Sequence, residues 1–172
     1  MARKKQIRTV LQRRRREGKT NYKTRLKLLE SGKPRLVVRK SLKNITAQII
    51  AYKPAGDKIE VAVHSKELKN LGWTFSNNNL PAAYLVGLLV GKKALSKKVS
   101  NVILDLGLNT STKGSKVYAV LKGVVDAGLN IPYSDSNLPS NDRIAGKHIE
   151  LYRKVPVLKS FNDIKEKILK GK

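Results

Sequence analysis

The sequence contains no cysteine, which excludes disulfide bonds, thiolate catalysis and zinc sites built on cysteine. Acidic residues are also scarce, with 12 Asp+Glu against 37 Lys+Arg in 172 residues, for a net charge of +25. These few acids are scattered, so paired-acid hydrolysis and two-metal nuclease chemistry have no evident carboxylate sets. Aromatic residues make up only 5% of the chain. The strands therefore lack the aromatic platform of an RNA-recognition motif. We predict no catalytic residues, no metal and no cofactor.

Long apolar runs are missing as well. The N-terminus, MARKKQIRTV, lacks the apolar segment of a secretory signal. The longest uncharged apolar stretch, residues 80–91, is too short to cross a bilayer. A mitochondrial presequence is an alternative for a basic N-terminus, but here the arginine block continues into apparent structure. We therefore expect no association with a membrane.

Positive charge is concentrated near the N-terminus, where residues 1–43 hold 17 basic and two acidic residues. Charge of this density disfavours a compact state unless a polyanion neutralises it. Nucleic acid is the first candidate, and a membrane surface or an acidic protein are alternatives. Residues 13–16 are four consecutive arginines, which project about 100° apart around a helix. This arrangement suits a segment surrounded by phosphates, which the arginine fork binds in a bidentate manner.

Two short helices are predicted within this basic segment. Ile7, Val10 and Leu11 have helical spacing and lead into the arginine block, which Gly18 interrupts. The second helix is predicted to have Thr20 as its N-cap. A buried edge follows at Tyr22, Leu26 and Leu29, and Gly32 is the C-terminal stop. Tyr22 could instead stack on a base. Because the charges of the segment have no evident partners, we expect it to be disordered without RNA.

An α/β domain is predicted after residue 33. The stretches RLVVRKS, NITAQIIAY and KIEVAVHS alternate and are β-branched, which indicates an antiparallel meander over residues 35–65. A mostly apolar helix begins at Pro81 and runs to about Lys98, with Gly87 and Gly91 on one side for close approach. A buried strand (VSNVILDL), a helix over residues 117–128 and a last strand (LNIPYS) follow. The order predicts a mixed five-stranded sheet.

The remaining chain is polar and irregular, with one or two helical turns in LPSNDRIAGKHIEL. Ser160 and Asp163 have the spacing of a capping box for a final helix. We therefore divide the chain into a basic N-terminal RNA-binding arm (residues 1–33), an α/β globular domain (34–134) and a C-terminal extension with short helices (135–172).

Few positions outside the arm are candidates for chemistry. Asp105 follows a strand, and we expect it to cap or to bind a backbone amide nearby. The loop GLNTSTKGS precedes a helix, but its order does not match a P-loop. Lys113 and Lys116 in this helix start still favour an anion, such as an RNA phosphate. On the first strand, Arg35 and Arg39 share a face and extend the basic surface.

Several blocks in order resemble one family. RRRREGKTNYKTRLKLLESGKPRLVVRKS, NITAQII, PAAYLVGLLVGKKAL, LDLGLNTSTKGSKVYAVLKGVVDAGLNIPYSD and LPSNDRIAGKHI are similar to the archaeal-type large-subunit ribosomal protein family eighteen. The resemblance covers residues 13–149. Asn21 stands where relatives often have an acid, and the GLNTSTKGS loop lacks the His-Arg-Pro-like start that we associate with this loop in the family. These departures put individual contacts in doubt, but not the fold.

The resemblance implies a ribonuclease-H-like three-layer α/β/α sandwich without catalytic carboxylates. It implies a structural constituent of the cytoplasmic ribosome that binds 5S rRNA and anchors it to the large rRNA in the central protuberance, beside neighbouring ribosomal proteins. Family and residue reasoning together predict these RNA-binding residues: Arg3, Lys4, Lys5, Arg8, Arg13, Arg14, Arg15, Arg16, Gly18, Lys19, Thr20, Tyr22, Arg25, Arg35, Arg39, Lys40, Lys113 and Lys116. An RNA-processing enzyme of the same fold, and a protein that compacts DNA or binds membrane surfaces, are the alternatives.

Overall fold

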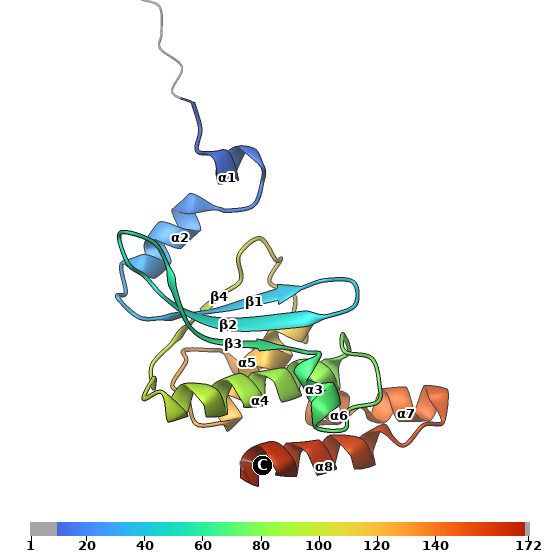
Figure 1. Cartoon of the computed structure of the whole chain (residues 1–172). Coiled ribbons are helices and arrows are strands. Elements are labelled where there is room, and N and C mark those ends of the chain that lie inside the picture. Colours follow the sequence, from blue (N-terminus) through green and yellow to red (C-terminus); the bar gives the residue numbers. More distant parts are fainter. Residues whose placement is uncertain (1–9, 171–172) are drawn as a thin grey trace, which may run out of the picture.

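The computed structural model describes residues 10–170 (Figure 1). The predictions for Arg3, Lys4, Lys5, Ile7 and Arg8 lie outside the described residues. The elements, in chain order, are α1 (Arg13–Arg16), α2 (Tyr22–Leu29), β1 (Arg35–Lys40), β2 (Ile45–Ala51), β3 (Lys58–His64), α3 (Glu67–Asn70), α4 (Leu80–Ser96), β4 (Ile103–Asp105), α5 (Lys116–Asp126), a 3-10 turn (Asp135–Asn137), α6 (Asn141–Ala145), α7 (Lys147–Arg153) and α8 (Val157–Lys170).

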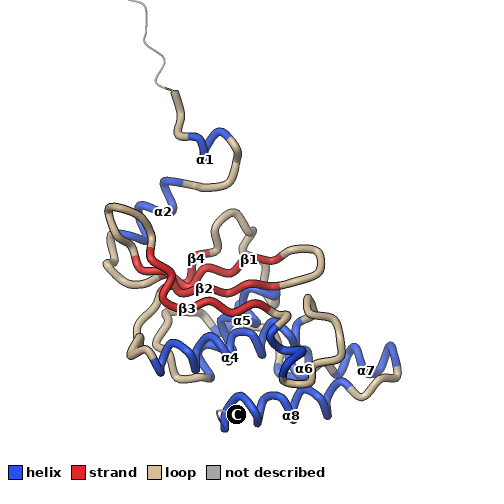
Figure 2. Tube along the Cα trace, viewed as in Figure 1, coloured by secondary structure: helices blue, strands red, loops and turns tan. Residues whose placement is uncertain are grey.

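The sheet has four strands in the order β3-β2-β1-β4 (Figure 2). β1, β2 and β3 form the predicted antiparallel meander, and β4 is parallel to β1. Alternation places one residue set on the inner face, where cross-strand partners such as Leu36 with Ile49 and Val38 with Ala47 are buried together. The hydrophobic pattern therefore fixes the register, since a slip of one residue would expose this whole set.

The prediction of a fifth strand is wrong for the described residues. The LNIPYS segment forms only an isolated parallel bridge, between Asn130 and Asn101. Pro132 has no N–H to donate to a strand ladder, and β4, the strand beside this segment, is only three residues long. The short partner and the missing donor leave too few hydrogen bonds to extend the sheet.

All the long helices lie on one side of the sheet. α4 and α5 pack against its inner face, and α8 lies against α4 on the side away from the strands (Figure 1). The layers therefore run sheet, helix pair, helix. The mixed α/β class is confirmed, but the α/β/α sandwich that the resemblance implies is not.

The predicted contact strip on α4 is confirmed and is matched from α5. A Cβ built on Gly87 would lie 2.1 Å from the carbonyl oxygen of Val120, and one on Gly123 would lie 2.2 Å from the carbonyl oxygen of Tyr84. Distances this short show that the two helix backbones touch where glycine removes the side chain. The α4–α5 pair is thus a rigid support for the sheet.

The N-terminus of α4 is capped by Asn79, whose side chain accepts a hydrogen bond from the backbone N–H of Ala82 at 2.8 Å. We expect Asn79→Ala to lower the free energy of unfolding by about 1 kcal/mol, because a helix N–H would lose its partner. Urea unfolding measures this difference. Asn70→Ala, at an exposed position on α3, is the control, and equal losses in both variants would contradict the assigned cap.

The C-terminal helix is part of the core rather than an appendage to it. Val157, Phe161, Ile164 and Ile168 form one buried stripe on α8. The capping-box prediction at Ser160 is wrong, since the helix begins three residues earlier, directly after Pro156, where the apolar stripe starts. The predicted helical turns between residues 141 and 153 are confirmed as α6 and α7.

Candidate nucleic-acid interface

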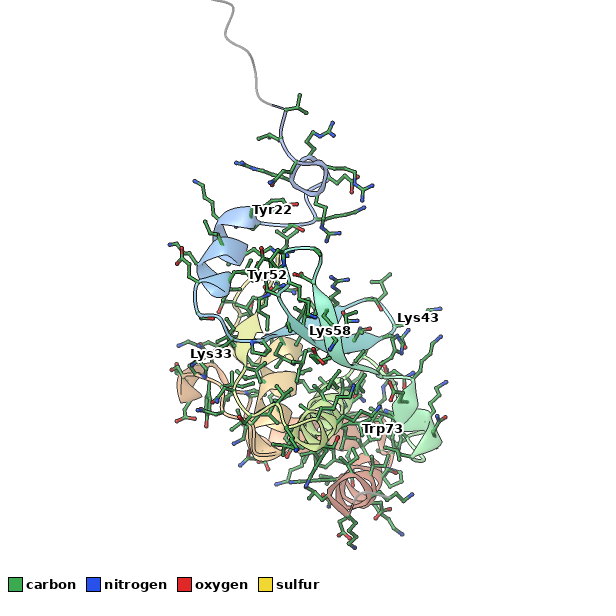
Figure 3. The ribbon with its side chains drawn as sticks, turned by 60° about the vertical axis from the view of Figure 1, so that its left-hand side comes forward. Tyr22, Lys33, Lys43, Tyr52, Lys58 and Trp73 are labelled. Carbon is green, nitrogen blue, oxygen red and sulfur yellow. The ribbon has the colours of Figure 1, made fainter. Side chains whose placement is uncertain are left out.

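The arginine block forms α1, a single exposed helical turn that stands away from the sheet and its helices (Figure 3). Glu17, which follows the turn, pairs with Arg13 at 3.6 Å and with Lys19 at 2.8 Å. Both pairs are solvent-exposed and contribute little to stability. Gly18, at a φ of +62°, turns the chain from α1 towards α2 in a conformation that favours glycine.

The N-cap of α2 differs from the prediction. The side chain of Asn21, not Thr20, accepts hydrogen bonds from the backbone N–H groups of Lys23 and Thr24. Asparagine outranks threonine as a cap, and Asn21 has the extended backbone that a cap requires. The hydroxyl of Thr20 instead accepts a hydrogen bond from Nε of Arg14 at 2.9 Å. Thr20 therefore links α1 to the start of α2.

The predicted apolar edge of α2 is also wrong. Leu26 is 62% exposed, and no residue of the helix is buried. The helix has only eight residues, about two turns, and it meets the body at the β4 end of the sheet rather than at an apolar face. Arg25 links it to the body through polar contacts.

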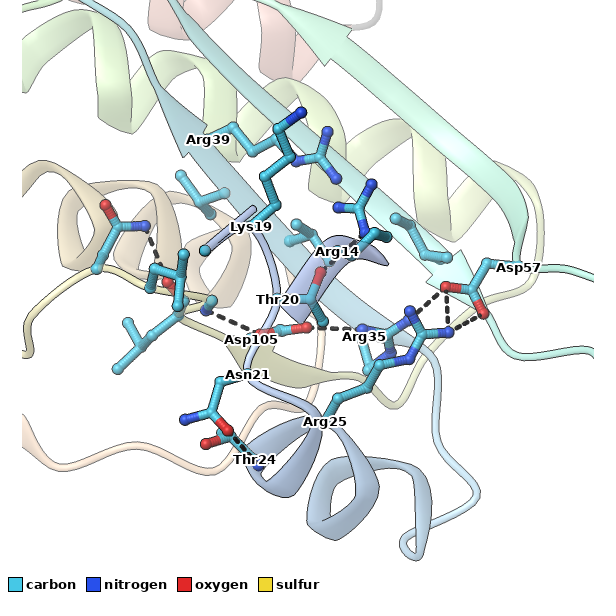
Figure 4. Close-up of a pocket in the computed structure, with 18 residues that line it drawn as sticks. Arg14, Lys19, Thr20, Asn21, Thr24, Arg25, Arg35, Arg39, Asp57 and Asp105 are labelled. Carbon is cyan, nitrogen blue, oxygen red and sulfur yellow. Dashed lines mark hydrogen bonds and ion pairs between the residues drawn. The ribbon is translucent and has the colours of Figure 1, made fainter. Parts of the chain in front are cut away.

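A chain of ion pairs connects α2 to the sheet (Figure 4). One guanidinium nitrogen of Arg25 contacts both carboxylate oxygens of Asp57 at 2.9 Å, and Asp57 also accepts from Arg35 at 2.9 Å. Arg35 donates on its other side to Asp105 at 2.7 Å, and Asp105 accepts from the backbone N–H of Gly107. The prediction that Asp105 binds a nearby amide is confirmed.

The placement of Arg35 on the basic surface is wrong. Its exposure is only 4%, because two carboxylates draw the guanidinium inwards. Arg39, four residues along β1, is exposed. The two-residue period thus gave the shared face correctly, but not the partners that bury one of its two arginines.

A groove of about 500 Å³ lies between the arm and the outer face of the sheet. Its lining combines cations of the arm with apolar side chains of the strands and of the loop after β4, including Val37, Ile50 and Leu108. Such a surface can take both phosphates and exposed bases. The predicted RNA-binding residues that line it are Arg14, Gly18, Lys19, Thr20, Arg25, Arg35 and Arg39, whereas Arg13, Arg15, Arg16 and Tyr22 do not.

A second basic cluster is separate from the groove lining. Lys40 ends β1 and Lys116 begins α5, and Lys113 lies in the loop before that helix. Partial burial, together with the positive charge of Lys40, lowers the pKa of Lys116. Repulsion between the two positive charges favours an anion near them.

No sequence pattern singles out Asp57. It lies in the loop between β2 and β3, distant in sequence from both arginines that it contacts. The scarcity of acids is the sequence property that points to it, because an acidic side chain in so basic a chain has many possible cationic partners.

Between residues 10 and 170, no group of three or more histidine or acidic side chains could hold a metal ion. Within the same range, no helix has both the length and the apolar composition needed to cross a membrane.

Comparison with known proteins gives one consistent match. The family model described as "Ribosomal large subunit proteins 60S L5, and 50S L18" matches residues 6–101 and 96–134. The large ribosomal subunit protein uL18 of Methanococcus maripaludis is 53% identical over 140 residues, covering 81% of this chain and 72% of that protein. The protein of the same name from Methanothrix thermoacetophila is 51% identical over 157 residues, covering 91% and 93%.

Proposed function

We propose that this chain, which belongs to the family of large-subunit ribosomal proteins 60S L5 and 50S L18, binds 5S rRNA and anchors it to the large rRNA in the central protuberance. It is a structural constituent of the large ribosomal subunit. The observation that carries the RNA proposal is the exposed arginine turn beside a groove that is both basic and apolar. The cationic side chains neutralise phosphates, and the groove contacts sugars or unpaired bases.

Two surfaces contribute in this proposal. The arm and the groove contact 5S rRNA through the exposed predicted residues of α1, α2 and β1, which leaves out the buried Arg35. The lysines at the end of β1 and the start of α5 contact a further RNA segment, such as the large rRNA. Contacts to RNA phosphates and sugars position an RNA and depend little on its sequence. We expect the fold of 5S rRNA, rather than a short motif, to supply the specificity.

The protein has no catalytic role in this proposal. The two acids nearest the groove, Asp57 and Asp105, are each held by Arg35 and lack a third carboxylate beside them in the described part of the chain. A ribonuclease-H-type reaction needs carboxylates that are free to bind metal ions. Incubation with an RNA–DNA hybrid and magnesium should therefore leave the hybrid intact.

Titration of the full chain into labelled 5S rRNA tests the proposal. If six to ten phosphates are neutralised, affinity should fall roughly 10³- to 10⁵-fold between 50 and 200 mM salt. An unrelated RNA hairpin and a DNA duplex of similar length are the controls. Equal affinity for the three nucleic acids would contradict 5S rRNA recognition and would favour a general polyanion binder.

A further inference from the structure

The carboxylate of Asp57 lies in a groove lined mainly by cationic, polar and apolar side chains. It lines the groove where an RNA is proposed to bind, in a chain with three times as many basic as acidic residues. A negative charge beside RNA phosphates opposes binding, so electrostatics alone would favour its removal. Its contacts indicate what it does instead, because both of its oxygens are used by arginines from different elements.

α2 has little else to hold it. The helix has eight residues, none of which is buried, and isolated helices of this length are marginal in water. Arg25, at its centre, contacts both oxygens of Asp57, with side chains that are only 29% and 24% exposed. A partly buried and networked pair is worth more than a fully exposed one. Among the described residues, the Arg25–Asp57 pair is the side-chain hydrogen-bonded link between α2 and the body.

The network continues into a rigid part of the fold. Asp57 is held by Arg35, a 4% exposed residue of the central strand pair, and Arg35 is held by Asp105 at the end of β4. Both β1 and β4 are fixed by ladder hydrogen bonds. The Arg35–Asp57 and Asp57–Arg25 salt bridges thus connect the sheet to α2. The hydrogen bond between Thr20 and Arg14 connects the segment before α2 to α1.

We propose that Asp57 is a positioning residue that orders α2 before RNA arrives, through the chain Asp105–Arg35–Asp57–Arg25. This inference rests on the proposed RNA-binding function and deepens it. Preorganisation of a binding segment lowers the entropy lost on association, so it raises affinity without any added contact. It also bears on the expectation of a disordered arm, because Arg25, one of the charges assumed to be unpartnered there, pairs with Asp57 on the body.

Asp57→Asn gives a test in which two effects have opposite signs. The variant raises the net charge by one, so electrostatics alone predicts tighter RNA binding. Loss of the positioning contact predicts weaker binding, by about tenfold at 150 mM salt, which corresponds to the cost of ordering the backbone of about one residue. Glu30→Gln, an exposed acid at the end of α2 with the same charge change, is the matched control and should bind as well as the original protein or slightly better.

Arg25→Lys is the second variant, because Asp57→Asn also removes a partner of a buried arginine and can weaken the fold. It keeps the net charge and leaves the Arg35–Asp57 and Arg35–Asp105 pairs in place, but loses the planar fork. We expect faster amide exchange over residues 22–29 of the free protein, unchanged exchange in β1 and β2, and weaker 5S rRNA binding. Arg143→Lys, at an exposed position on α6 outside the proposed RNA-binding surface, is the control with the same exchange of side chains and should show none of these changes.

The outcomes separate this inference from the function on which it rests. If the original protein prefers 5S rRNA, but Asp57→Asn and Arg25→Lys bind it as tightly and protect residues 22–29 equally, the positioning role is overturned. If the original protein shows no preference for 5S rRNA, the proposed function fails instead. The amide exchange measurement needs no RNA, so faster exchange in both variants would still support the ordering of α2 in that case.

Discussion

Replacing Arg13, Arg14, Arg15 and Arg16 together by glutamine is expected to weaken binding to 5S rRNA by about 100-fold at 200 mM salt. Each phosphate contact contributes roughly 0.7 to 0.9 to the slope of log affinity against log salt. Loss of four contacts should lower that slope by about 3, which corresponds to a factor on the order of 100 at this salt concentration if affinities converge near 1 M. Filter binding or fluorescence anisotropy at four or five salt concentrations measures both quantities.

The same variant should unfold at an almost unchanged temperature. All four side chains are exposed and α1 contributes no residue to the core, so their loss removes no buried contact. A control variant with the same change in net charge replaces exposed lysines at the other end of the chain: Lys154, Lys159, Lys167 and Lys170. If the control loses as much affinity as the arginine variant, total charge rather than the arm explains binding.

Gly123→Ala is expected to destabilise the fold by roughly 3 kcal/mol, at the upper end of the usual cost of overpacking. The added Cβ would lie 2.2 Å from the carbonyl oxygen of Tyr84 and 2.8 Å from the backbone nitrogen of Leu88. Both atoms belong to the backbone of α4, which cannot move aside as a flexible side chain could. α4 and α5 would have to separate, and with them the layer that supports the sheet.

The sign of the stability change in Gly123→Ala tests the close contact between α4 and α5. In an ordinary helix, replacement of glycine by alanine stabilises by up to about 1 kcal/mol. Thermal or urea unfolding that showed a stabilised Gly123→Ala variant would therefore contradict the close contact between α4 and α5. Lys122→Ala, the neighbouring position, is the control. It loses only the partly exposed pair with Asp126, and should stay within about 0.5 kcal/mol of the original protein.

Much of the fold followed from local patterns. The alternation in β1, β2 and β3 predicted the meander, because a half-buried strand must repeat every two residues. The apolar stretch after Pro81 predicted α4, and the spacing of Gly87 and Gly91 predicted its contact strip. The predictions that were wrong concern ends and partners: the fifth strand, the caps at Thr20 and Ser160, and the buried edge of α2. Thr20 is outranked by a stronger neighbouring cap, and the apolar stripe of α8 starts before Ser160. The fifth strand lacks donors and a long partner, and α2 meets no apolar face.

The sequence by itself determined that the chain is strongly cationic near its N-terminus, has an α/β core, and offers no cysteine and few acids for chemistry. These properties depend on composition and short-range periodicity, which need no knowledge of distant contacts. Only the tertiary structure decided that Arg35 is buried while Arg39 is exposed, and that Asp57 joins α2 to the sheet. An ion pair forms between residues that are far apart in the chain, so its existence depends on how the strands and loops are arranged in space.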